Sequence, residues 1–94
     1  MATEVTANAT LSRYEIRVDG ELAGFTRFIA GAAGAPVVFP HTEIDPRFAG
    51  QGLATQLIGA ALDDMRAQGR KIVPVCPFVQ SFIAKHPDYQ DLVA

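Results

Sequence analysis

The chain has 94 residues, of which 49% are hydrophobic and 19% are charged, and its formal net charge is −2 at pH 7. A chain of this length supports one small domain. It has no basic cluster of the kind that nucleic-acid binding needs, and no apolar run long enough to cross a bilayer. Composition and charge therefore argue against nucleic acid and against membrane as the main partners.

The opening stretch MATEVTANAT lacks the basic start and the apolar core of a secretory signal peptide. We expect residues 1–9 to form a flexible tail, residues 10–94 to form a single domain, and the protein to be cytoplasmic. Cys76 is the only cysteine, which excludes an internal disulfide and a thiolate zinc site and suits a reducing compartment. No metal site is expected.

Three strands are predicted in the first half of the chain. Residues 11–18 and 21–30 form a hairpin around Asp19-Gly20, a dipeptide that tolerates the positive φ of tight turns. A glycine-rich loop follows, and residues 37–44, VVFPHTEI, predict a third strand that ends before Asp45-Pro46.

A long amphipathic helix is predicted after the third strand, because apolar residues recur at intervals of three and four until Gly69. These residues are Leu53, Leu57, Ile58, Ala61, Leu62 and Met65. Residues 71–76 predict a short buried strand that pairs in parallel with the third strand through this helix. A second helix begins at Pro77 and ends before Pro87, and a last short turn or helix follows.

The long helix starts at Gly50-Gln51-Gly52 and carries no acidic residue in its first turns. The first turn of a helix exposes N–H groups without partners and a partial positive charge. Two glycines also remove side chains where a backbone would meet a ligand, which suits a phosphate group. Alternatively, Gly50 simply ends a turn, and Thr55 or water satisfies the amides.

A dinucleotide-binding interpretation of this stretch is weak. The G-x-G-x-x-G pattern lacks its third glycine, because Thr55 stands there, and the following strand ends at Cys76 where a ribose-binding carboxylate would be expected.

Residues 47–54, RFAGQGLA, match the [RQ]-x-x-G-x-[GA] signature of the GNAT N-acetyltransferase superfamily. Together with HTEIDP, CPF and KHPDYQDLV, the chain from about Tyr14 onwards resembles the small single-domain branch with a Cys-Pro-Phe segment. The resemblance implies an α/β fold (α+β in some schemes) of the minimal GNAT type. This fold has a mixed antiparallel and parallel sheet of four to five strands, the long helix after the third strand, and a second helix near the C-terminus.

The same resemblance implies a function and a cofactor site. Acetyl-coenzyme A would lie between two parallel strands that pair at one end and splay at the other, and its acetyl group would pass to an amine, for example a protein or peptide lysine. Pro74 supports such a splay, although a proline also suits an edge strand. The cofactor-binding residues expected from the resemblance are Ile44, Arg47, Gly50, Gln51, Gly52, Leu53, Ala54 and Thr55.

Three side chains are catalytic candidates. Alternation places His41 and Glu43 on one face of the third strand, where either could act as a general base. Ile83 occupies the position at which many superfamily members carry a catalytic tyrosine, so Cys76 could serve as the acid or accept the acetyl group. The alternatives are a solvated carboxylate, a satisfied histidine and an inert core thiol.

Two rival interpretations remain open at this point. One is a coenzyme A-binding sensor or interaction module with little or no catalysis, and the other is a scaffold without a ligand. The acceptor groove is expected to be open, because the first two strands meet in a tight turn, and could admit a lysine, a polyamine or a partner subunit. His86 and Tyr89 are expected to fix the end of the chain rather than to do chemistry.

Overall fold

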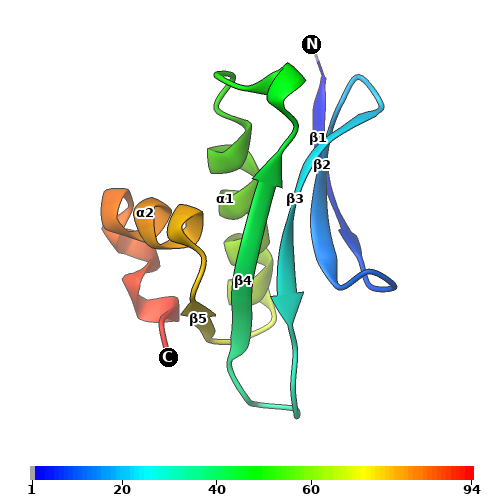
Figure 1. Cartoon of the computed structure of the whole chain (residues 1–94). Coiled ribbons are helices and arrows are strands. Elements are labelled where there is room, and N and C mark those ends of the chain that lie inside the picture. The colour runs from blue at the N-terminus through cyan, green and yellow to red at the C-terminus, as the bar shows by residue number, and fades with distance from the viewer. Residues whose placement is uncertain (1) are drawn as a thin grey trace.

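The computed structural model describes residues 2–94, and within them one five-stranded sheet is packed against two α-helices (Figure 1). The strands are β1 (Thr3–Asn8), β2 (Arg13–Val18), β3 (Glu21–Ile29), β4 (Val37–Ile44) and β5 (Ile72–Pro74). The helices are α1 (Leu53–Ala67) and α2 (Pro77–Lys85), with short 3-10 helices η1 (Pro46–Phe48) and η2 (Pro87–Leu92). No helix in this part of the chain is long and apolar enough to cross a membrane.

The sheet follows the order of the chain, β1-β2-β3-β4-β5. The first four strands are antiparallel neighbours, and β4 and β5 run parallel, with α1 as the crossover between them. The hairpin turn has positive φ at Asp19 and Gly20, 50° and 85°, as the sequence predicts for a tight two-residue turn. The predicted mixed sheet and both predicted helices are confirmed.

The N-terminal segment differs from the expectation of a flexible tail over residues 1–9. Thr3–Asn8 forms β1, which pairs along its whole length with β2, from Thr3↔Val18 to Asn8↔Arg13. The backbone groups of Ala2 also exchange hydrogen bonds with Asp19. The β-branched residues of TEVTAN favour an extended strand, but only Val5 packs against the core, so the apolar signal of this edge strand is weak.

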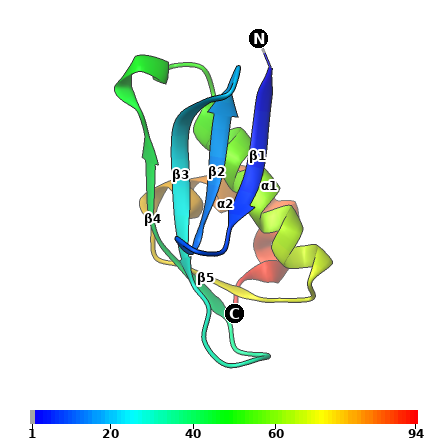
Figure 2. The same ribbon diagram turned by 90° about the vertical axis from the view of Figure 1, so that its right-hand side faces the viewer.

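Both helices cover the same face of the sheet, as the view in Figure 2 shows with α1 and α2 behind the strands. The six apolar residues predicted for the long helix are all buried. They pack on Ile16, Val18, Val37 and Phe39 from the sheet, all of them buried in the same core cluster. We call the opposite face of the sheet, which no helix within residues 2–94 covers, the outer face.

A β-bulge in β4 resets the alternation of its side chains. Arg27 and Ile29 of β3 pair with His41 and Val38, so two steps along β3 match three steps along β4. Phe39 and Thr42 consequently both point into the core. His41 and Glu43 pair with Arg27 and Phe25 and lie on the outer face, the shared face that the sequence predicts for them.

The parallel pairing of β4 and β5 is short. It runs from Val37↔Ile72 to Phe39↔Pro74, and the chain then turns so that the Cys76 N–H donates to the Phe39 carbonyl at 2.9 Å. Strand β4 continues to Ile44 without β5 beside it. Pro74 is thus the last residue of β5, which is also the edge strand of the sheet, so both interpretations of this proline hold.

Candidate functional site

The connection from β4 to α1 depends on two glycines in the left-handed region. Gly50 has φ of 81° and Gly52 has φ of 71°, a conformation that costs other residues about 1–2 kcal/mol. Before them, the Asp45 carboxylate accepts a hydrogen bond from the Arg47 N–H at 2.9 Å and caps η1. The loop therefore turns sharply at the end of β4 and delivers Gly52 as the N-cap of α1.

The backbone N–H groups at the start of α1 are not capped by a side chain. No side chain caps the helix at Gly52, and the first turn holds no acidic residue. A Cβ atom added at Gly50 or Gly52 would meet nothing within 4 Å, so the space in front of the loop is open. Free amides, a positive helix end and room beside the backbone are the features that hold a phosphate group, and this site fits a pyrophosphate.

Beside this loop, β4 presents an edge that has no strand partner. The Asp45 N–H donates across to Ala23 of β3 at 2.7 Å, and backbone groups alternate sides along a strand. The N–H and C=O of Ile44 therefore point to the opposite edge, where β5 ends its pairing at Phe39. An extended ligand with amide groups could pair with β4 at this edge.

A cavity of about 310 Å³ brings the helix start and the strand end together. Its lining includes seven of the eight predicted cofactor-binding residues: Ile44, Gly50, Gln51, Gly52, Leu53, Ala54 and Thr55. Phe48, Ala49 and Phe78 complete it, and sequence reasoning did not single out Phe78, a half-exposed aromatic residue in α2. The sequence pattern did not reveal that Phe78 is exposed, because an apolar residue in an amphipathic helix is ordinarily assigned to the core.

Arg47 is the predicted residue that the cavity does not include. Its guanidinium lies 3.1 Å from Asp45 and 3.7 Å from Glu21, and over the ring of Phe48. Hydrogen bonds from the Arg47 side chain and backbone hold the pKa of Asp45 below its ordinary value. In this structure Arg47 braces the loop instead of facing the helix start.

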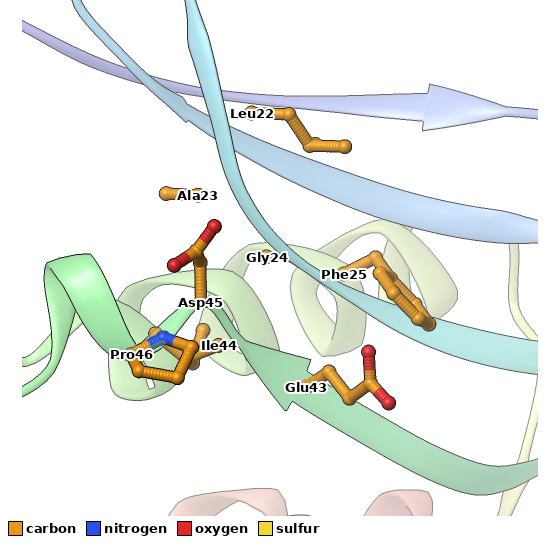
Figure 3. Close-up of a pocket in the computed structure, with 8 residues that line it drawn as sticks. All are labelled: Leu22, Ala23, Gly24, Phe25, Glu43, Ile44, Asp45 and Pro46. Carbon is orange, nitrogen blue, oxygen red and sulfur yellow. The ribbon is translucent and has the colours of Figure 1, made fainter.

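A second cavity, of about 470 Å³, opens at the end of the sheet where β3 begins and β4 ends (Figure 3). Its lining residues are Leu22, Ala23, Gly24, Phe25, Glu43, Ile44, Asp45 and Pro46. Phe25 and Glu43 lie in front of their strands with α1 behind them, so this cavity belongs to the outer face (Figure 3). Ile44 lines both cavities, so both border the end of β4.

Glu43 and His41 form a pair on the outer face. The His41 Nε2 and Glu43 Oε1 atoms are 3.1 Å apart, and the two side chains are 52% and 61% exposed. The Phe25 ring lies beside His41, with 6.1 Å between ring centroids, and the Arg13 guanidinium covers Phe25 at 4.5 Å. Phe25 is a further residue of this region that sequence reasoning missed, because residues 21–30 were predicted as a hairpin strand without a face for each side chain.

Cys76 lies on the other side of the sheet. Its side chain is 2% exposed, and its thiol donates to Thr42 Oγ1 at 3.3 Å. The structure thus pairs Glu43 with His41 but separates both from Cys76. Ile83, at the position of the missing tyrosine, is buried in the core.

His86 and Tyr89 make structural contacts near the C-terminus, as expected. His86 stacks on Phe82 with 4.2 Å between ring centroids, and its Nδ1 lies 2.8 Å from the Phe82 carbonyl oxygen. The Tyr89 hydroxyl donates to Asp63 of α1 at 2.7 Å, and this bond raises the pKa of Tyr89. No group of metal-ligating side chains occurs within residues 2–94.

Comparisons with known proteins agree with this geometry. The family model for GCN5-related N-acetyl-transferase matches residues 13–92. Because this match spans most of the chain, the protein belongs to the GCN5-related N-acetyltransferase (GNAT) family, and its sheet with two helices is a minimal form of the GNAT fold. No curated protein matches the chain.

Two solved structures share the fold at low sequence identity. A GCN5-like protein of Staphylococcus aureus, solved by NMR in solution, has a TM-score of 0.71 and 20% identity over 97% of this chain and 87% of its own. The ribosomal-protein-alanine N-acetyltransferase of Brucella melitensis biovar Abortus 2308 has a TM-score of 0.59 and 24% identity. That match covers 87% of this chain and 60% of the Brucella chain.

Proposed function

We propose that this protein is an acetyl-coenzyme A-dependent N-acetyltransferase that acetylates a primary amine, such as a lysine side chain of a protein or peptide. The observation that carries the proposal is the meeting of an uncapped helix start and an unpaired strand edge around one cavity, with Ile44 between them. Membership of the GNAT family supports the same function.

In this proposal, coenzyme A is held mainly by backbone groups. The amides of Gly52, Leu53 and Ala54 and the positive end of α1 bind the pyrophosphate, which explains why neither a cap nor an acidic residue is present. The free edge at Ile44 pairs with the amides of the pantetheine arm, as an added strand would. The pantetheine then runs along β4 towards the point where β5 leaves it.

Glu43 and Cys76 carry out the two proton transfers from opposite faces of the sheet, and His41 supports Glu43. Acetyl-coenzyme A supplies an acetyl thioester, whose C–S bond breaks as the C–N bond to the amine forms. Glu43, steadied by His41, accepts the proton that the amine must lose. Cys76 gives a proton to the departing thiolate. Exchange with solvent then removes the proton from Glu43 and returns one to Cys76. Because its thiol is buried and hydrogen-bonded, we assign Cys76 this role rather than that of acetyl acceptor.

The outer-face cavity is our candidate for the acceptor site. It borders the cofactor cavity at Ile44 and also includes Glu43, so an amine bound there would lie beside the proposed base, on the side of β4 opposite to the helices. Leu22 and Phe25 offer apolar walls, and the carboxylates of Glu43 and Asp45 suit an alkylammonium group. Since no helix within residues 2–94 covers this face, a side chain presented by a large protein could reach it.

A coenzyme A-binding module with little catalysis is the second candidate. The separation of Cys76 from Glu43 and the buried Ile83 in place of a tyrosine favour it. Such a module would share the cofactor cavity and lack amine-dependent turnover.

Calorimetric titration with acetyl-coenzyme A and with coenzyme A tests cofactor binding. We expect Gly52→Glu to weaken binding at least about 100-fold, because a carboxylate beside a pyrophosphate costs several kcal/mol. Gly52→Ala is the matched control: it carries the same left-handed strain without the charge, and should retain affinity within about tenfold. Absence of heat with the native protein would overturn both candidate functions, and equal losses in the two variants would contradict the proposed pyrophosphate position.

A further inference from the structure

A third cavity extends the cofactor site between the two helices. It has a volume of about 250 Å³ and lies between the first turns of α1 and the length of α2. Ala54, Thr55 and Phe78 line both this cavity and the cavity at the helix start, so the two are neighbours. A ligand anchored at the start of α1 can therefore continue into the groove between α1 and α2.

The direction of the ligand follows from its chemistry. The pyrophosphate of coenzyme A stands between the pantetheine arm and an adenosine that carries a 3′-phosphate. If the pantetheine runs from the helix start along the edge of β4, the nucleoside must leave on the other side of the pyrophosphate. The groove between α1 and α2 borders the helix start, and its lining includes no residue of β4.

The walls of this groove suit a nucleotide. Phe78 is 49% exposed and offers a ring at the junction of the two cavities. Phe82 forms the floor, where α1 and α2 approach so closely that a Cβ at Gly59 would lie 3.5 Å from its ring. Aromatic rings in an open groove are a common surface for stacking a base.

Lys85 supplies a positive charge at the far end of the groove. It lines the cavity next to His86, and none of the ion pairs formed within residues 2–94 involves it. The other lysine, Lys71, donates to the backbone carbonyl of Asp91. The His86 ring is fixed by its contacts with Phe82 and forms the wall beside Lys85.

We propose that this groove binds the adenosine 3′-phosphate end of coenzyme A, with Phe78 against the nucleoside and Lys85 on the 3′-phosphate. Lys85 then makes the protein discriminate coenzyme A from 3′-dephospho-coenzyme A, which lacks only that phosphate. The inference rests on the proposed function, because it requires the pyrophosphate at the start of α1.

Calorimetric affinities for coenzyme A and 3′-dephospho-coenzyme A test this inference without a measurement of activity. The native protein should bind coenzyme A about tenfold more tightly, as expected for one charge-assisted contact to a phosphate. Lys85→Gln should weaken coenzyme A to the level of the dephosphorylated ligand and leave the latter unchanged. Phe78→Ala should weaken both ligands alike.

Arg27→Gln is the matched control, because it removes one positive charge from the outer face, far from the groove. It should preserve the tenfold ratio, and circular dichroism should show that each variant is folded. Equal affinity of the native protein for the two ligands, or an unchanged ratio in Lys85→Gln, would overturn the inference while leaving the proposed function intact. Failure of the native protein to bind either ligand would overturn the proposed function and this inference with it.

Discussion

The thiol of Cys76 donates a hydrogen bond to the Thr42 hydroxyl across 3.3 Å, where β5 has just left β4. The Thr42 hydroxyl lies 2.9 Å from that of Thr26 on β3, and all three side chains are buried. This chain of polar groups lies at the closed end of the gap between β4 and β5. In the function that we propose, the sulfur of the cofactor would end beside this thiol.

Replacement of Cys76 by serine tests the proton-donor role. Serine keeps the hydrogen bond to Thr42 and nearly the same volume, but its hydroxyl is a much weaker acid than a thiol. We expect kcat to fall about tenfold or more, with KM and the denaturant midpoint nearly unchanged. A variant with native kcat would identify Cys76 as an inert core thiol.

The Glu43→Gln variant tests the base on the outer face. The amide cannot accept the proton of the amine, so kcat/KM should fall about 100-fold or more, while calorimetry shows native affinity for acetyl-coenzyme A. Glu4→Gln is a suitable control, because Glu4 is an exposed carboxylate on β1, outside the acceptor cavity. Native turnover in Glu43→Gln would exclude this residue as the base.

Glu15 provides a prediction about stability and pH. Burial raises the pKa of this carboxyl, but hydrogen bonds from Arg13, Arg17 and Asn8 outweigh burial, so its folded pKa lies below its ordinary value. Its contribution to stability is therefore full above the unfolded pKa, about 4.3, and is lost as the pH falls through the folded pKa.

Urea unfolding of Glu15→Gln measures this contribution. At pH 7 the variant should lose about 1–3 kcal/mol, because charged hydrogen bonds are replaced by weaker ones. Its free energy of unfolding should also depend less on pH below about pH 4.3 than that of the native protein. Parallel pH profiles for the two proteins would contradict a depressed pKa at Glu15.

The elements that obey local rules were predictable from the sequence. Spacing places the six apolar residues of α1 in the core, and Asp19-Gly20 forms the expected turn. The uncapped start of α1 at Gly50-Gln51-Gly52 was also predictable, because left-handed glycines and a missing cap depend on only a few neighbouring residues.

Features that depend on long-range pairing were not predictable in this way. Strand β1 contributes one packed residue, Val5, and it forms because β2 offers a free edge, which no pattern within residues 1–9 reveals. Cys76 and Glu43 lie on opposite faces because of the bulge in β4 and the turn after Pro74. The half-buried position of Phe25 and the exposure of Phe78 depend likewise on which faces of the sheet and of α2 lie uncovered.

The most direct test of acetyl transfer is the release of free coenzyme A thiol from acetyl-coenzyme A in the presence of a lysine-containing peptide, with Glu43→Gln in parallel. We expect release to depend on the peptide, mass spectrometry to find one acetyl group on the lysine for each thiol released, and Glu43→Gln to abolish most of the rate. Tight binding of acetyl-coenzyme A without peptide-dependent release would contradict acetyl transfer to lysine and favour the coenzyme A-binding module.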